Sequence, residues 1–360
     1  MFYLLCYLFI HNFVVSAHNA NKGCNKCEKS FPGNIEEGKD YGGFDIDSWT
    51  SRTDAEHRRQ MQEIVTAGTK AEREELQTKY GTKYSVLCKL AYYDFITMTI
   101  IDPMHNLFLG TAKRMIQVWK DAGFITKHNV HIIQERINQI ECPNDVGKIP
   151  GKFDDFSFAS FTADELKNWT LLFSLYSLKG VVPDEHLKCW KYFVIACVYL
   201  CNQAITVSDL TVIHGYLLKF CTSFESLYGS DAVTPNMHLH CHLVDCIKAY
   251  GPVYGFWLFS FERFNGLLER MPRNNKNIEL QLMRRFERDL QAQNIPFPEA
   301  LYDQFLPLFS GLNTQQRGTL DVHDINVDFL LMSSKNTDYR TLDWSDLSCV
   351  EMKRKQVIDY

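Results

Sequence analysis

An apolar run rich in β-branched residues extends from Tyr93 to Ile101 and ends at a single carboxylate, Asp102. Pro103 follows, and the apolar positions from there to residue 122 lie near helical spacing. A short apolar run bounded by a turn signal is typical of a buried strand, and a period near 3.6 is typical of a helix. The pattern therefore predicts a strand over 93–101, a helix over 104–122, and Asp102 at the tip of the strand.

The rest of the chain is mostly helical in pattern. Polar residues over 52–80 predict a helix that ends at Gly81, with a capping box between Thr69 and Glu72. A second capping box, Thr162 with Glu165, opens a block of apolar helices that continues to residue 228. An aromatic helix over 253–271 and a charged helix over 277–293 follow. Strands are expected within 1–17 and over 327–332.

These elements define a chain of α/β class that is mostly α by content. We divide it into a core segment with a Cys pair (1–110), a helical insertion (111–233), a segment with a His cluster and an acidic helix that returns to the core (234–293), and a weakly structured C-terminal extension (294–360).

Composition adds few constraints. Hydrophobic residues make up 46% of the chain and charged residues 22%, values that are ordinary for a globular protein. The net charge of −5 does not indicate a nucleic-acid binder, although a local basic surface would suffice for one. Several of the twelve cysteines lie in apolar helical runs, which favours reduced cysteines and an intracellular protein.

The first 17 residues are apolar and end in Val-Ser-Ala, as a secretory signal peptide would. They contain no Lys or Arg, and as a membrane span they are short and interrupted. A secreted or membrane-anchored protein is therefore the less favoured interpretation, and no membrane partner is expected.

Two carboxylates are candidates for chemistry. Asp102 at a strand end could bind a divalent metal, but an Asp that caps the following helix, with Pro103 at its first position, is favoured by the local pattern alone. Glu262 lies inside an aromatic helix, where a carboxylate is costly unless something binds it. A pairing with Arg or a solvent-facing position explains Glu262 equally well.

Cys24-x-x-Cys27 and the histidines 238, 240 and 242 could supply the two thiolates and two imidazoles of a tetrahedral zinc site. On a helix, His238 and His242 would share a face and His240 would point away, whereas on a strand all three would share a face. Because the two groups are far apart in the chain, the site would be tertiary. On the residues alone, a reduced Cys pair and packed histidines are favoured.

One dense basic stretch follows Glu262 and could hold phosphates beside a metal site. The alternative is a solvated helix face interleaved with Glu279, Glu287 and Asp289. The candidate DNA-binding residues are Arg263, Arg270, Arg273, Lys276, Arg284 and Arg285, with Arg288 in the same stretch.

The segment 102–110, Asp-Pro-Met-His-Asn-Leu-Phe-Leu-Gly, resembles the second-aspartate signature of CACTA (En/Spm-type) transposases, in which a His follows the Asp after two residues. Further similar segments come in the family's order over roughly residues 20–290. The segments 158–164, 168–170, 235–240 and 251–257 resemble the family's insertion domain. The segment 259–266 resembles the one that carries the family's final acidic residue.

This resemblance implies an RNase H-like core that is interrupted by a long all-helical insertion. Asp102 and Glu262 would be catalytic ligands of Mg or Mn, His105 a supporting residue, and DNA the substrate. The vertebrate antigen-receptor recombinase is similar in plan and has a tertiary Cys2His2 zinc site, which implies structural zinc at Cys24, Cys27, His238 and His242.

The chain departs from the family at its beginning. The family's first catalytic Asp precedes the Cys pair, whereas the first acidic residue here is Glu28, after that pair. An RNase H-like core incomplete at its N-terminus would lack one bridging ligand of the two-metal site. We therefore expect a nuclear or intracellular transposase-derived protein that is inactive in strand transfer, with DNA and a second copy as candidate partners and no small-molecule substrate. The alternative is a non-enzymatic DNA- or protein-binding module.

Overall fold

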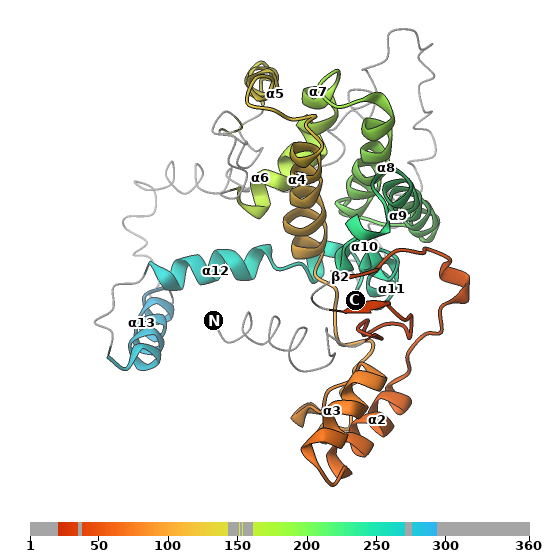
Figure 1. Ribbon diagram of the computed structural model, residues 1–360. Helices are drawn as coiled ribbons and strands as arrows, with labels where there is room; N and C mark the ends of the chain where they lie inside the picture. The colour runs from red at the N-terminus through yellow and green to blue at the C-terminus, as the bar shows by residue number, and fades with distance from the viewer. Residues whose placement is uncertain are drawn as a thin grey trace.

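The protein is mostly helical in the computed structural model, which describes residues 21–34, 38–142, 151, 153, 161–270 and 276–293 (Figure 1). The elements before Asp102 are β1 Gly33–Asn34, β2 Gly38–Lys39, the 3-10 helix η2 Ile46–Ser48, α2 Asp54–Thr66, α3 Lys70–Tyr80 and the 3-10 helix η3 Val86–Lys89. The helices of the central block are η4 Met104–Ala112, α4 Lys113–Asp121, α5 Val130–Asn138, α6 Ala163–Asn168, η6 Trp169–Phe173, α7 Ser174–Leu178, α8 Asp184–Leu200 and α9 Val207–Tyr228. The remaining helices are the 3-10 helix η7 Ser230–Ala232, α10 Pro235–His240, α11 Leu243–Tyr250, the 3-10 helix η8 Val253–Gly255, α12 Phe259–Glu269 and α13 Ile278–Gln293.

The main core lies among the helices from η4 to α11, and tryptophans form its centre. Trp119 of α4 meets Trp190 of α8 edge to face with ring centroids 5.5 Å apart, and both are fully buried. The indole N–H of Trp190 donates a 2.9 Å hydrogen bond to Ser174 Oγ, so the ring's polar group is satisfied inside the core. The predicted block of apolar helices is confirmed, including the capping box of Thr162 and Glu165.

The predicted polar helix over 52–80 is two helices, α2 and α3, which form a separate lobe (Figure 1). The break falls before Thr69, whose side chain caps α3 in the predicted box with Glu72. The helix ends at Gly81, as expected, and the φ of +68° there is the left-handed conformation that favours glycine.

The predicted strand over 93–101 is wrong: this segment is a series of turns. The Asp94 carboxylate accepts from the backbone N–H groups of Ile96 and Thr97 at 2.8 and 2.9 Å, and Asp54 of α2 accepts from Phe95 N at 2.8 Å. These side chains satisfy the amides that a sheet would otherwise use, because Asp competes locally with regular structure. Apolar residues such as Phe95 and Ile101 are buried without strand pairing.

The expectation of high helix content is confirmed, but the strand content is small, and the described residues do not contain the central sheet expected of an RNase H-like core. Within the described residues the sheet is a single antiparallel hairpin, with Gly33 opposite Lys39 and Asn34 opposite Gly38. The strands expected within 1–17 and over 327–332, like Arg273 and the extension from 294, lie outside the described residues. No helix in the described part is both long and apolar enough to cross a membrane.

The helix predicted over 104–122 is present and begins with a π-helical stretch, η4, that continues into α4. Gly110 lies where α10 crosses η4. A Cβ at Gly110 would approach Asn236 Nδ2 to 2.2 Å and the His105 carbonyl oxygen to 2.7 Å, closer than real Cβ atoms come. The absence of a side chain at Gly110 therefore sets how closely α10 approaches the helix that follows Asp102.

We expect Gly110→Ala to lower the free energy of unfolding by about 1–3 kcal/mol, because the new methyl group clashes with backbone and with a packed Asn. Gly215→Ala is the matched control, since Gly215 is in α9 with no atom within 4 Å of its Cβ position. There, alanine should add up to about 1 kcal/mol through helix propensity. Urea denaturation of both variants measures the difference, and equal stabilities would contradict the close packing.

Candidate functional site

Four side chains from distant parts of the chain form a compact donor cluster. Cys24, Cys27, His238 and His242 place their ligand atoms within 4.8 Å of one another. Cys27 Sγ lies 3.4 Å from His238 Nε2 across 211 residues of sequence, and the Nε2 atoms of the two histidines are 3.3 Å apart. A zinc ion with bonds of about 2.0–2.3 Å to tetrahedral N and S ligands has ligand-to-ligand edges of about 3.3–3.8 Å. The donor types and the two measured edges therefore fit a tetrahedral ion such as zinc.

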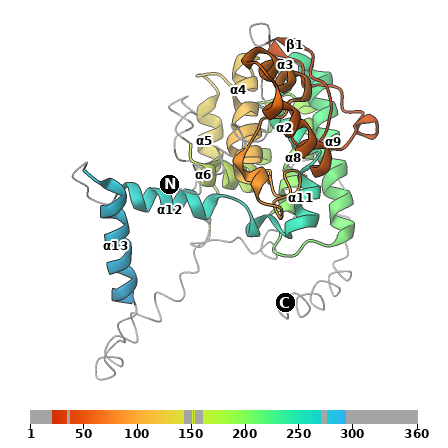
Figure 2. The same cartoon turned by 90° about the horizontal axis from the view of Figure 1, so that it is seen from below.

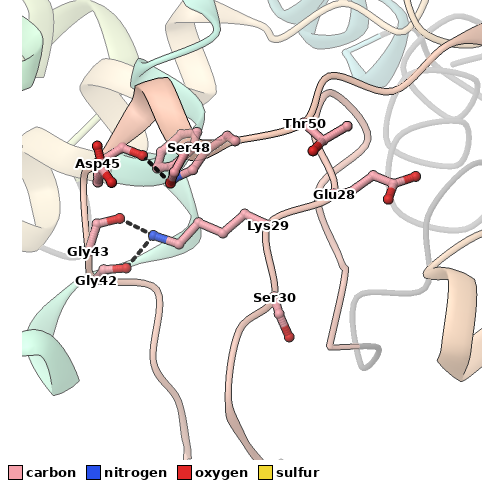
Figure 3. Close-up of a pocket in the computed structure, with 9 residues that line it drawn as sticks. Glu28, Lys29, Ser30, Gly42, Gly43, Asp45, Ser48 and Thr50 are labelled. Atoms are coloured by element: carbon pink, nitrogen blue, oxygen red, sulfur yellow. Dashed lines mark hydrogen bonds between the residues drawn. The ribbon is translucent and has the colours of Figure 1, made fainter.

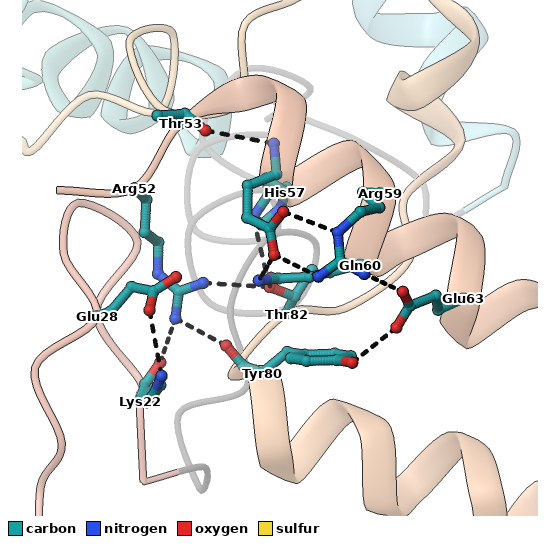
Figure 4. A network of polar contacts seen from close by, with 11 residues as sticks. Lys22, Glu28, Arg52, Thr53, His57, Arg59, Gln60, Glu63, Tyr80 and Thr82 are labelled. Carbon is teal, nitrogen blue, oxygen red and sulfur yellow. Dashed lines mark hydrogen bonds and ion pairs between the residues drawn. The ribbon is translucent and has the colours of Figure 1, made fainter. Parts of the chain in front are cut away.

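A buried arginine holds the loop that carries the two cysteines. Arg52 is 6% exposed, and its guanidinium donates to the carbonyl oxygens of Cys24 and Cys27 at 2.8 and 3.1 Å. It also donates to the carbonyl oxygens of Lys22 and Tyr80, both at 2.8 Å (Figure 4). It thus fixes both cysteines and joins them to the C-terminal end of α3. Within the loop, Lys26 N donates to Cys24 Sγ at 3.3 Å, a backbone contact that stabilises a thiolate.

His238 lies in α10, and His242 follows in the turn between α10 and α11, where it is the N-cap of α11. Phe31 meets the His238 ring edge to face at 4.8 Å, and Trp49 packs on His238 at 4.5 Å and on His242 at 5.7 Å. His240 points into the main core, where its Nε2 lies 3.1 Å from Thr111 Oγ1. The helical alternative is confirmed for His238 and His240, which lie in α10. His242 is in the turn after α10 but joins His238 in the cluster, while His240 lies apart from both, as the helical spacing predicted.

The electrostatics of the cluster favour one thiolate. Burial would raise the pKa of Cys24, but the hydrogen bond from Cys27 and the charges of His238 and His242 lower it well below its usual value. The pKa of Cys27 is raised, first by its hydrogen bond to Cys24 and then by burial. Burial also lowers the pKa of His238, so its ring is held neutral, the form that binds a metal.

A second set of predicted residues meets at the start of η4. Asp102 is 3% exposed, and its carboxylate accepts four hydrogen bonds. Oδ1 accepts from the backbone N–H groups of Met104 at 3.2 Å and Leu258 at 3.0 Å. Oδ2 accepts from the backbone N–H of His105 at 3.0 Å and lies 2.6 Å from His105 Nδ1. The carboxylate thus caps η4 and also holds the chain that enters α12.

His105 connects the two predicted carboxylates. Its Nε2 lies 3.8 Å from Glu262 Oε1, while its Nδ1 contacts Asp102. Burial opposes protonation of the ring, but the hydrogen bond and charge of Asp102, with the charge of Glu262, raise the pKa of His105 above its usual value. The Asp102 side chain is 1% exposed and that of Glu262 is 41% exposed, so the chain of contacts runs from the interior to the surface.

The structure therefore brings together both groups that the sequence singled out, Cys24–Cys27 with His238–His242 and Asp102 with His105 and Glu262. The capping role of Asp102, which the local pattern favoured, is observed as well. Within the described residues, the Cys2His2 cluster is the one group of three or more Cys, His, Asp or Glu side chains gathered closely enough to hold an ion. A Mg or Mn site at Asp102 and Glu262 stays a prediction.

The predicted DNA-binding residues lie on the surface. Arg263 and Arg270, in and at the end of α12, and Arg284 and Arg285 of α13 are exposed, as is Lys276 just before α13. Glu279, Glu287 and Asp289 of α13 are exposed too. Both helices extend away from the main core (Figure 2), so the basic residues are accessible and are interleaved with acidic ones.

Sequence reasoning missed Arg52 and a pocket of about 390 Å³ beside the metal-ligand cluster. Lys29 reaches across this pocket to the carbonyl oxygens of Gly42 and Gly43 and lies 4.7 Å from the centre of the Trp49 ring, which also lines the pocket (Figure 3). No sequence signal separates a buried Arg from a surface one, and the pocket is made by loops without a motif.

Comparisons of the chain with protein-family models, with curated proteins and with solved structures found no match. The CACTA resemblance therefore rests on the sequence motifs alone.

We expect the full chain to bind one zinc ion. Cys27→Ser should weaken zinc binding by at least about 100-fold, because it removes a ligand itself, which costs more than removing a residue that only hydrogen-bonds to a ligand. Cys142→Ser is the matched control, because Cys142 is a half-buried free cysteine outside the cluster. Competition with a chromophoric chelator measures both affinities. Unchanged affinity in Cys27→Ser, or a wild-type chain that takes up no zinc, would contradict the assignment.

Proposed function

We propose that this chain is a transposase-derived protein of the DDE, RNase H-like class, built around a structural zinc centre and no longer competent for strand transfer. The observation that carries the proposal is the contact of one imidazole, His105, with both Asp102 and Glu262, two carboxylates from helical segments on either side of the long insertion. The CACTA resemblance predicted that these two residues share a site, whereas the sequence around each residue did not.

In the ancestral reaction, two carboxylates would hold divalent metals that activate the attacking oxygen and stabilise the leaving oxygen of a phosphodiester. Asp102 and Glu262 are the residues for that role in this chain. His105 would orient Asp102 through Nδ1 and balance the charge of Glu262 through Nε2. The exposed arginines of α12 and α13 would contact DNA phosphates, and a role on DNA implies a nuclear or other DNA-containing compartment.

Two observations support the loss of strand transfer. The Asp102 carboxylate already accepts four hydrogen bonds, so metal binding would have to replace contacts that hold η4 and α12 in place. In addition, within the described residues no third acidic side chain joins Asp102 and Glu262 in a group that could hold an ion. A two-metal site with a missing bridging ligand loses both charge and geometry.

The same two observations favour a second function, a non-enzymatic DNA-binding module that uses the scaffold and its exposed basic residues. In this function Asp102 is purely a structural residue that caps η4 and holds the entry to α12. The two functions differ in one respect: the first retains metal affinity at Asp102 and Glu262, and the second does not.

A Mn²⁺-dependent nicking assay on supercoiled plasmid tests the proposed loss of cleavage. We expect wild type and Asp102→Asn to nick at the same background rate, because the site lacks a complete ligand set. Nicking by wild type that Asp102→Asn abolishes would contradict the inactive site. Far-UV circular dichroism of Asp102→Asn is the control for folding, because this carboxylate also accepts the hydrogen bonds that hold η4 and the entry to α12.

Iron-mediated cleavage of the protein backbone separates the two functions. With Fe²⁺, ascorbate and peroxide, a remnant metal site should produce cuts near residues 102 and 262 that Glu262→Gln removes. If DNA binds in a salt-dependent gel shift while no such cuts appear, the DNA-binding module is the correct function and the remnant metal site is not.

A further inference from the structure

Helices α12 and α13 extend from the main core (Figure 2). Both helices expose large apolar side chains. On α13, Leu280, Met283, Phe286 and Leu290 are 42–60% exposed, and they recur every three or four residues. This spacing places them on one side of the helix. A stripe of this kind is typical of a helix that packs against a partner.

Helix α12 adds to the same surface. Phe264 and Leu267 are 45% and 51% exposed, and the Phe264 ring meets Phe286 of α13 edge to face with centroids 6.0 Å apart. At 100° per residue, Phe264 and Leu267 lie on the opposite side of α12 from Glu262. The α12–α13 surface, defined here as Phe264, Leu267, Leu280, Met283, Phe286 and Leu290, is therefore separate from the carboxylate site.

The exposed state is costly for α13. None of its apolar side chains is buried among the described residues, and the stripe includes two large side chains, Met283 and Phe286. Isolated helices of this length are marginal in water, and in proteins most of their stability comes from packing of an amphipathic face. Burial by a partner would supply that packing.

The charge pattern indicates which partner fits. Over 259–293 the sequence has seven basic and five acidic residues, so the region is close to neutral and does not repel a copy of itself strongly. The spacing of the apolar positions along α13 is nearly the same from either end of the helix. When α13 pairs antiparallel with another α13 about a two-fold axis, Leu280 faces Leu290 and Met283 faces Phe286 of the copy.

The same register pairs opposite charges. Arg284 of one chain lies opposite Glu287 of the other, on the same flank of the stripe, and the two-fold axis repeats the pair. A parallel arrangement would instead bring equivalent arginines to the same level. An isologous interface requires a self-complementary surface, and the antiparallel register provides one.

We propose that the α12–α13 surface is a homodimer interface in which two α13 helices pack antiparallel, with Arg284–Glu287 ion pairs on both sides. The six exposed side chains would bury on the order of 1,000 Å² in total over the two copies, which is the size at which specific interfaces begin. The dimer is therefore expected to be reversible.

Sedimentation equilibrium of the full chain tests the proposal. Wild type should dimerise reversibly, and Met283→Glu should raise the dimer Kd by at least about tenfold, because a charge replaces the centre of the apolar stripe. Val207→Glu is the matched control: Val207 is 79% exposed at the start of α9 and should leave the Kd unchanged. A wild-type chain that stays monomeric at its highest soluble concentration would overturn the proposal.

A charge swap tests the register without removing apolar area. Arg284→Glu and Glu287→Arg should each raise the Kd, because each brings like charges together across the interface. The double variant should restore a Kd close to that of wild type. A dimer that is insensitive to Met283→Glu and to both single charge reversals would place the interface elsewhere and overturn the proposal.

Discussion

The contact between Cys24–Cys27 and His238–His242 is the constraint on which the arrangement of the chain depends most. Residues 21–34 and 38–51 contain little regular structure, so their position is set by side chains: the donor cluster, the Arg52 guanidinium and the packing of Trp49 on the two histidines. The same loop reaches further. Asn25 and Lys26 donate to the carbonyl oxygens of Thr99 and Ile96, in the turns that lead into Asp102. A metal in this cluster would therefore stabilise a continuous set of contacts from the N-terminal loop to the carboxylate site.

Asp102 is the second residue on which contacts from distant segments converge. Four hydrogen bonds make it the cap of η4 and the anchor of α12, which explains why this carboxylate is tolerated at 3% exposure. Its contact with His105, and that of His105 with Glu262, keep the two carboxylates in one place. These structural roles are sufficient to explain the presence of Asp102 under either of the two proposed functions.

Local signals in the sequence were sufficient for the helices. The capping boxes at Thr69 and Thr162, the end at Gly81 and the charged helix at 277–293 were all predictable, because caps and periodicity act over a few residues. The strand over 93–101 was predicted wrongly, since Asp54 and Asp94 bind the amides of this segment. The convergence of Cys27 with His238 and of Asp102 with Glu262 joins distant segments and could be expected only from the ordered motifs. Arg52 could not be predicted, because its acceptors are backbone carbonyls that carry no sequence signal.

The central claim is that a tetrahedral zinc centre joins the N-terminal loop to α10. X-ray absorption at the zinc edge of the full chain tests it most directly, because it reports the ligand types themselves. The account predicts two sulfur ligands at about 2.3 Å and two imidazole nitrogens at about 2.0–2.1 Å. A shell of oxygen and nitrogen alone, or one with a single sulfur, would contradict it.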